Sequence, residues 1–276
     1  MFHINSLVLH ATARIHHVEN FTGPLSIKTV MQGEAFWRTS AGVFGLGPDE
    51  FLICNAGDVY SIAIDSPTPV TTCCVFFATG FVERIALDAT TPVDAALDDP
   101  ERDAPALEFL SRLHSGPLTW RVQSLAERCR AESQPSSFEE DFLEIAHDML
   151  HLYGEIQERI ARIPATRLST RKELFRRIER AREYMRYAGR NVSLTESARV
   201  AGLSPYHFHR AFSAAHQTTP HAYLTRLRLE IAKERIANGA LIADAADGAG
   251  FSNPPSFTRL FRLHYGMSPT QFRKIG

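Results

Sequence analysis

Basic side chains gather in the last third of this chain, and they are the first candidates for chemistry. Residues 169–276 hold 18 Lys and Arg against 8 Asp and Glu, whereas residues 1–168 hold 12 against 23. The balances of +10 and −11 add to the net charge of −1. A basic segment on an acidic body favours a polyanion such as nucleic acid as its partner. Two oppositely charged domains that dock on each other are the alternative explanation.

Side chains that could hold a catalytic metal are not clustered in the first half of the chain. No histidine occurs between His17 and His114, although a metal-dependent barrel enzyme needs grouped His and carboxylate ligands. His16 and His17 are adjacent, and adjacent side chains on a strand point to opposite faces. We therefore expect a protein that is not an enzyme, with no catalytic residue, no metal and no cofactor. A metal-dependent barrel enzyme with a basic tail is the less favoured alternative.

Four cysteines occur in the chain: Cys54, Cys73, Cys74 and Cys129. They are too few for a disulfide scaffold and contain no CxxC pair typical of zinc. Cys73 and Cys74 could form a thiol switch, but they lie in a β-branched run, where cysteine is usually inert and buried. We expect a reduced, cytoplasmic protein, because no secretory signal and no apolar run of about 18 residues is evident.

An internal repeat organises the basic segment. Residues 198–212 align with residues 246–261, and the match continues downstream without a gap. Two copies suggest a duplicated small unit rather than a solenoid, which usually needs three or more repeats. Each copy reads as a short helix, a turn at Gly202 or Gly250, and a second helix. This pattern is typical of a helix-turn-helix unit, whose second helix can enter the major groove of DNA.

The second helix of each unit has an N-terminal cap and an apolar stripe. Ser204 caps the first, and Ser252 or Asn253 caps the second. Ser204 is followed by Pro205, which suits the first helical position. In the first unit Phe208 and Phe212 lie on the core face, four residues apart.

A long helix that starts at Pro220 and ends at Asn238 joins the two units. Its length of about 18 residues corresponds to roughly 27 Å, close to the pitch of B-DNA, roughly 34 Å. It could therefore hold two reading helices in successive grooves. An upstream helix, capped by Ser169 or Thr170, carries basic residues that could meet phosphates or acidic groups. They are Arg171, Lys172, Arg176, Arg177, Arg180, Arg182 and Arg186.

Residues from about Phe175 to Lys274 resemble the AraC/XylS-type DNA-binding domain. The stretch GFSNPPSFTRLFRLHYGMSPTQFR, residues 250–273, carries the resemblance, together with AGLSPYHFHRAF and RLRLEIAKERI. The resemblance implies that both second helices meet DNA, that RNA polymerase is a partner, and that activation is more frequent than repression. The implied DNA-binding residues are Ser204, Tyr206, His207, His209, Arg210, Asn253, Pro254, Pro255, Thr258, Arg259 and Arg262. A phosphate or an intradomain carboxylate is the alternative partner for Arg210 and Arg259.

Three departures from the pattern point to a weaker or less selective second contact. Pro254 and Pro255 cannot make polar base contacts. Gln217 stands where the second copy has Gly266, which costs the helix end roughly 1 kcal/mol. Gly248 lies inside a short helix and loosens it by about the same amount.

The N-terminal half reads as short strands punctuated by turns, which suits a β-barrel. The expected strands are 25–31, 35–39, 43–46, 51–54, 59–64 and 70–77, with a turn at Ser66-Pro67. The AraC/XylS resemblance implies a cupin-like barrel that binds a small-molecule effector. A mixed apolar and polar set could line its pocket: Phe36, Trp37, Phe51, Ile53, Tyr60 and Ile62. The alternative is that these side chains simply fill the barrel.

The middle of the chain reads as helical. Helices are expected over 104–114 and 118–130, and a heptad stripe follows. The stripe consists of Phe138, Phe142, Ile145, Met149, Leu152 and Ile156. An intermolecular helix pair that forms a homodimer is one interpretation, and packing of this helix on its own barrel is the other.

Taken together, the sequence predicts an α+β protein of three parts. A cupin-like barrel (1–100) precedes a helical dimerisation segment (101–164) and an all-α domain (170–276) with two helix-turn-helix units joined by a long helix. We expect a regulator that binds double-stranded DNA and responds to a small molecule, with no membrane partner. A regulator that responds to a protein partner or to thiol oxidation is the alternative.

Overall fold

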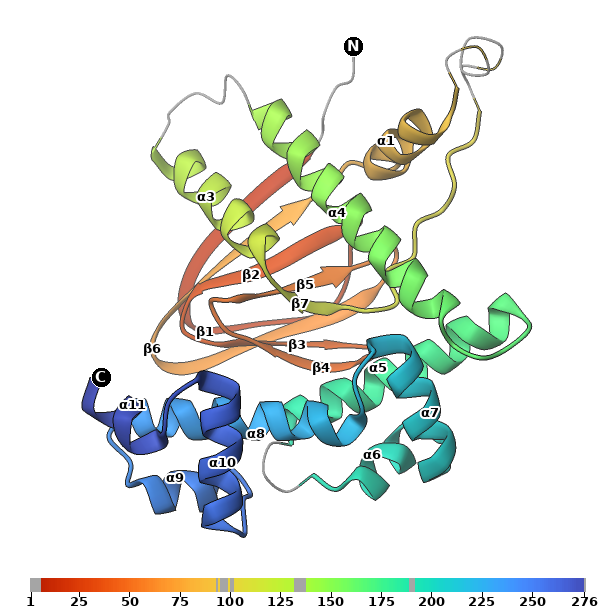
Figure 1. Ribbon diagram of the computed structural model, residues 1–276. Coiled ribbons are helices and arrows are strands. Elements are labelled where there is room, and N and C mark those ends of the chain that lie inside the picture. The colour runs from red at the N-terminus through yellow and green to blue at the C-terminus, as the bar shows by residue number, and fades with distance from the viewer. Residues whose placement is uncertain are drawn as a thin grey trace. The chain divides into compact units, whose positions relative to one another are not determined.

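The computed structural model describes residues 6–92, 94, 99, 102–131, 138–188 and 192–275. These residues form two compact units, which divide between Glu158 and Arg159. The first unit contains a curved sheet with helices, and the second is helical (Figure 1). The predicted α+β class is confirmed. Within the described part of the chain, no helix is long and apolar enough to cross a membrane.

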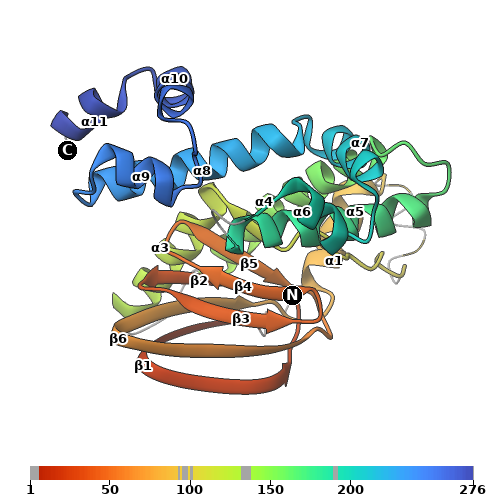
Figure 2. The ribbon, with the colours of Figure 1, turned by 90° about the horizontal axis from the view of Figure 1, so that it is seen from below.

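The sheet of the first unit is built around one long strand. The strands are β1 (Leu7–Thr22), β2 (Ser26–Gln32), β3 (Ala35–Thr39), β4 (Gly42–Leu46), β5 (Glu50–Cys54), β6 (Val59–Phe76) and β7 (Leu113–Ser115). Their order is β4-β3-β6-β2-β5-β7, β1 pairs with β6, and every pair is antiparallel. Strand β6 pairs with β3 along its first half and with β2 along its second. The result is a nearly closed barrel (Figure 2).

Two local predictions in this unit are wrong. The expected turn at Ser66-Pro67 does not divide two strands, because β1 pairs along β6 on both sides of this point. A register shift between Ala13 and Ile15 absorbs the irregularity. The helix expected over 104–114 is absent, and its last residues belong to β7, which pairs with β5. Asn55 fixes the preceding segment, since its side chain exchanges two hydrogen bonds with the backbone of Phe109.

Three helices accompany the barrel: α1 (Phe81–Thr90), α3 (Pro117–Ala131) and α4 (Phe138–Ala161). Helix α3, which the sequence predicts closely, contacts β1, β2, β5 and β6. Helix α4 carries the heptad stripe, and four of its members are buried within the chain itself: Phe142, Ile145, Met149 and Ile156. The ring of Phe142 meets Phe77 at 6.1 Å between centroids. These four side chains are therefore covered without a second copy of the chain, and the homodimer stays a prediction.

The second unit consists of seven helices among the described residues. They are α5 (Leu168–Tyr187), α6 (Leu194–Val200), α7 (Pro205–His216), α8 (Pro220–Ala237), α9 (Ile242–Gly248), α10 (Pro254–Tyr265) and α11 (Pro269–Ile275). The α6–α7 and α9–α10 pairs are the two expected helix-turn-helix units, and α8 joins them as predicted. The expected cap at Ser169 or Thr170 is wrong, because both residues lie inside α5, whose N-cap is Arg167.

Each helix-turn-helix unit encloses an aromatic core. In the first, Phe208 and Phe212 are buried, and Phe212 packs against Tyr223 of α8 at 5.6 Å between ring centroids. In the second, Phe257 and Phe261 are buried against the alanines of α9 and the apolar face of α8. Because the stripe at i and i+4 is buried in each second helix, the remaining faces are left for solvent.

Candidate nucleic-acid interface

The second helix of the first unit, α7, presents polar side chains at its N-terminal end. The Ser204 hydroxyl accepts a hydrogen bond from the backbone N–H of His207 at 3.3 Å, which confirms Ser204 as the cap. Tyr206, His209 and Arg210 are exposed, whereas the core residues between them are buried. A helix whose exposed first turns carry donors and a phenol ring fits the requirements of major-groove reading.

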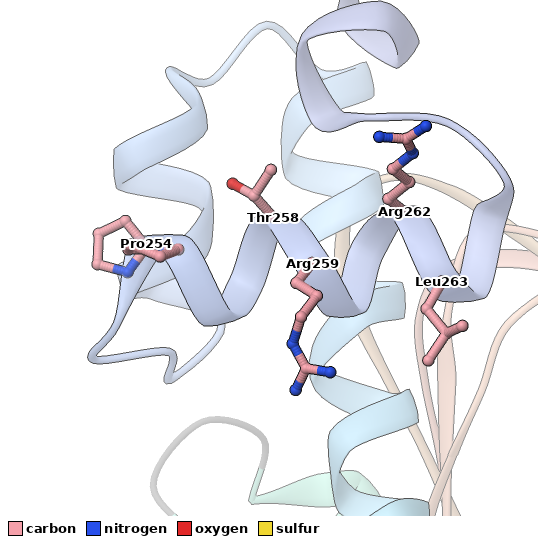
Figure 3. Close-up of a pocket in the computed structure, with 6 residues that line it drawn as sticks. Pro254, Thr258, Arg259, Arg262 and Leu263 are labelled. Atoms are coloured by element: carbon pink, nitrogen blue, oxygen red, sulfur yellow. The ribbon is translucent and has the colours of Figure 1, made fainter.

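The second helix of the other unit, α10, begins at Asn253. Its side-chain oxygen accepts from the backbone N–H of Ser256 at 3.2 Å, so Asn253 rather than Ser252 is the cap. Thr258 and Arg262 project from one side of α10, and Arg259 and Leu263 from another (Figure 3). An open hollow of about 890 Å³ is lined by Pro254, Pro255, Thr258, Arg259, Arg262 and Leu263. This face joins methyl and ring surfaces to two guanidinium groups.

The arginines of the two second helices are free of carboxylates. Among the described residues, Arg210, Arg259 and Arg262 form no ion pair, and all three are exposed. The intradomain carboxylate alternative is therefore not seen for them. The arginines of α5 differ, since Arg177 pairs with Glu173 at 2.9 Å. The sequence left phosphates and acidic groups as possible partners for the basic residues of α5. The structure pairs several of these residues with acidic side chains.

A buried ionic network holds the far end of α7 against α5. Glu179 lies 3.0 Å from His216 Nε2 through one oxygen and 2.9 Å from Arg182 through the other. Arg182 also donates to Glu183 at 3.0 Å. Burial outweighs the attraction of Arg182 and raises the pKa of Glu183 to about 7. Sequence reasoning missed this network, although the acidic and basic residues at i, i+3 and i+4 in an amphipathic helix could have indicated it.

Two of the three predicted departures concern helix ends. Gln217 caps α7 in the left-handed conformation with φ 53°, in the position that Gly266 occupies after α10 with φ 74°. Gly248 is the last residue of α9, and a Cβ there would lie 2.5 Å from the guanidinium carbon of Arg235. Because this guanidinium is the end of a flexible side chain, a larger residue at position 248 would displace it, and the loosening of α9 by Gly248 stays a prediction.

The six candidate pocket residues of the barrel do not converge on one cavity. Trp37, Tyr60 and Ile62 pack together in the interior cluster of the barrel. Phe51 and Ile53 alternate with Leu52, which belongs to that cluster, and so they face the opposite side of β5. Phe36, with Ile62, lines a separate hollow of about 470 Å³ that also contains His17 and Asp65. The structure thus favours a filling role for most of this set.

The adjacent cysteines lie in a protected environment. Cys73 and Cys74 are buried, and the Cys73 thiol lies 3.9 Å from the carbonyl oxygen of Val122. Burial raises the pKa of Cys73 to about 12 and raises that of Cys74 as well. Reactive cysteines need thiolate character and access. The thiol-oxidation alternative therefore has no support here. No group of three or more potential metal ligands is found among the described residues.

Comparison with known proteins locates the similarity mainly in the C-terminal part. A family model described as a helix-turn-helix domain matches residues 197–275. The probable transcriptional regulator LumQ of Photobacterium leiognathi is 38% identical over 85 residues, which are 30% of this chain and 34% of that protein. The virulence regulon transcriptional activator VirF of Yersinia enterocolitica is 24% identical over 252 residues, 88% of this chain and 87% of VirF.

Solved structures were compared as well. A transcriptional regulator of Chromobacterium violaceum, described as containing an AraC-type DNA-binding domain, is 25% identical. It covers 36% of this chain and 89% of its own, with a TM-score of 0.34. The chain spans about a third of the length of LumQ, so the match concerns the helix-turn-helix region. The second unit of the chain therefore contains a helix-turn-helix domain, in residues 197–275.

Proposed function

We propose that the chain is a sequence-specific DNA-binding transcription regulator whose α7 and α10 helices enter the major groove. The observation that carries the proposal is the pair of capped second helices with exposed arginines that no carboxylate of the described residues neutralises. An arginine can pair bidentately with a guanine edge, and Thr258 or the prolines can meet a thymine methyl group. Ser204, His207 and Asn253 shape the N-terminal ends, where the backbone can also approach phosphate.

The barrel is proposed to sense a small-molecule effector and to bias the readers through a coupling free energy between two sites. The relatives NphR of a Rhodococcus species and VirF are described as transcriptional activators, which favours activation. The AraC/XylS resemblance adds RNA polymerase as a partner and regulation rather than catalysis as the activity. The few cysteines favour the cytoplasm as the location. A homodimer is part of the proposal, and sedimentation of the full chain at two concentrations tests it. A strictly monomeric species would remove it.

Selection of bound duplexes from a random DNA pool by the full chain tests the main proposal. At two salt concentrations, we expect an enriched motif with two half-sites about one helical turn apart. A single enriched half-site would limit base reading to one helix. Binding without enrichment that vanishes at the higher salt concentration would indicate charge attraction alone, and would contradict sequence-specific reading.

A matched pair of variants links the motif to the helices. Arg210→Ala should relax the base preference at one position of one half-site, and Arg259→Ala should relax it, to a smaller extent, at one position of the other. Lys172→Ala serves as a control, because it removes one charge from the same unit outside both second helices. If all three variants lose affinity equally on every duplex, the arginines contact phosphates instead of bases.

A further inference from the structure

Lys28 is an ionisable side chain inside the barrel, and burial lowers its pKa. It lies in the middle of β2 and is completely buried, and its Nζ has no hydrogen-bond partner among the described residues. Lysine is almost never fully buried unless it is paired. The ammonium lies 3.6 Å from the ring centroid of Phe76 and 4.7 Å from that of Tyr60. Ring faces attract a cation, but they replace only part of the hydration it has lost.

No anionic side chain compensates the Lys28 charge within the described part of the chain. The titratable groups that act on it electrostatically are the thiols of Cys54, Cys73 and Cys74. Burial raises the pKa of Cys54 to about 12 and raises the pKa values of Cys74 and of the Tyr60 phenol. All these groups are therefore neutral near pH 7 and cannot act as counter-ions.

A second orphaned polar group lies beside the lysine. The Ser26 hydroxyl is buried and also lacks a hydrogen-bond partner. Ser26 and Lys28 are two residues apart on β2, so both side chains point to the same face of the sheet. Two unsatisfied donors at adjacent positions on one face are unusual, because buried polar groups are normally paired.

The register leads from these two groups to the protein surface. Lys28 is paired with Cys74 on β6, and Cys74 is paired with Leu9 on β1. Ser26 is likewise paired with Phe76, which is paired with Leu7. Leu7 and Leu9 are 56% and 50% exposed. Directly paired residues share a face of the sheet, so this face changes from half-exposed leucines at β1 to a buried cation at β2.

We propose that Lys28 and Ser26 anchor the carboxylate of an organic monoanion whose apolar part lies along Phe76, Leu7 and Leu9. A carboxylate would accept hydrogen bonds from both orphaned donors and would neutralise the ammonium. The site offers one positive charge and apolar walls. A phosphate dianion would bring excess charge into this environment and is usually met by arginines or several backbone N–H groups. The assignment rests on the proposed function, since it supplies the chemistry of the effector.

Calorimetric titration of the full chain with benzoate and with octanoate tests the site, with benzamide and octanamide as neutral isosteres. At least one acid should bind about tenfold more tightly than its amide, a difference of about 1.4 kcal/mol. Lys28→Met should abolish this preference, and Ser26→Ala should weaken acid binding by a smaller factor. Lys172→Met, which removes a lysine charge in the other unit, should bind the acid like the unaltered chain.

Several outcomes would overturn the site. They are equal binding of acid and amide, unchanged acid binding by Lys28→Met, and no binding of either acid. The comparison of acid with amide uses the unaltered chain, so it holds even if a variant fails to fold. Duplex selection without ligand separates this test from that of the proposed function. Acid binding without a selected motif would contradict the proposed regulator function and support the carboxylate site. A selected motif without acid binding would support the regulator function and contradict the carboxylate site.

Discussion

The two helix-turn-helix units share a scaffold and differ in what they expose and what they bury. Both have a left-handed residue after the first helix, a capped proline start and two phenylalanines four residues apart. The α7 face carries Tyr206, two histidines and an arginine, whereas the α10 face carries two prolines, Thr258 and two arginines. The scaffold is thus set by a few apolar and backbone requirements, and the exposed positions are left free to vary.

The interiors differ as well. The second unit has an apolar core built on alanines and phenylalanines, whereas the first contains the Glu179, Arg182, Glu183 and His216 network. A buried ionic network is weak evidence for stability, because desolvation opposes the attraction between the charges. Its value here is geometric, since it fixes the end of α7 against α5. The comparison predicts that the stability of the first helix-turn-helix unit depends on pH through its buried ionic network. The stability of the second helix-turn-helix unit should not depend on pH through its core.

The largest expected effect comes from truncating the shared phenylalanines. Phe212→Ala and Phe261→Ala should each lower the free energy of unfolding of their unit by about 3–5 kcal/mol, because each removes a fully buried ring. Hydrogen exchange of peptides from α7 and α10 separates the two units, whereas fluorescence of Trp37 and Trp120 reports only the first compact unit. Leu263→Ala, at a 78% exposed position, is the control. Equal acceleration in both units by either variant would show that they unfold together.

The next effect distinguishes the two interiors. The folded pKa of Glu183 is about 7, above its ordinary value of 4.5. Its contribution is therefore fully present below about pH 4.5 and is lost as the pH rises through about 7. Relative to Glu183→Gln, the unaltered chain should lose roughly 2–3 kcal/mol in the α5–α7 region between pH 5 and pH 8. Exchange of α10 peptides should show no such difference. A pH-independent difference in α7 would contradict the raised pKa.

Much of the helical compact unit, residues 159–276, could be predicted from the sequence because its signals are local. Gly202, Ser204 and Pro220 each fix a backbone conformation or a cap without help from distant residues. The compact unit that contains the barrel, residues 1–158, has fewer such local signals. Strand β1 alternates weakly and is recognised only through its pairing with β6. Residues 104–112 are held by Asn55, which lies about 50 positions earlier in the chain.

Site residues show the same division. The candidate DNA-contacting residues of the second helices follow from the AraC/XylS resemblance, and the structure places them on exposed faces. The candidate pocket residues follow from a mixture of apolar and polar character, which does not reveal the face of a strand on which a side chain lies. Lys28 was available as a signal, because a lysine between Ile27 and Thr29 interrupts a strand that is otherwise suited to burial. Its lack of a partner is a tertiary property and needed the structure.

The reading faces provide a third test of the comparison. Arg210→Ala should weaken binding of the selected duplex by about 1–3 kcal/mol and relax the preference at one base position. Arg259→Ala should have a smaller effect on preference if the prolines beside it make α10 dock mainly by shape. Electrophoretic competition with single-base substitutions of the duplex measures both. A larger loss of preference for Arg259→Ala would reverse the assignment of the stronger reader.

The smallest expected effect concerns the helix ends, where the two units differ by one residue. Gln217 adopts φ 53° after α7, a conformation that glycine tolerates without steric cost, as Gly266 does after α10. Gln217→Gly should therefore slow exchange in α7 peptides, which corresponds to a stabilisation of about 0.5–1 kcal/mol. Gly266→Gln should destabilise α10 by a similar amount. The reciprocal pair controls for the loss of the glutamine side chain, because contacts specific to Gln217 would not be transferred to position 266. If both variants destabilise their helices, the contacts of the Gln217 side chain stabilise α7 by more than the backbone strain costs. Glutamine at position 217 would then be favourable in the first helix-turn-helix unit.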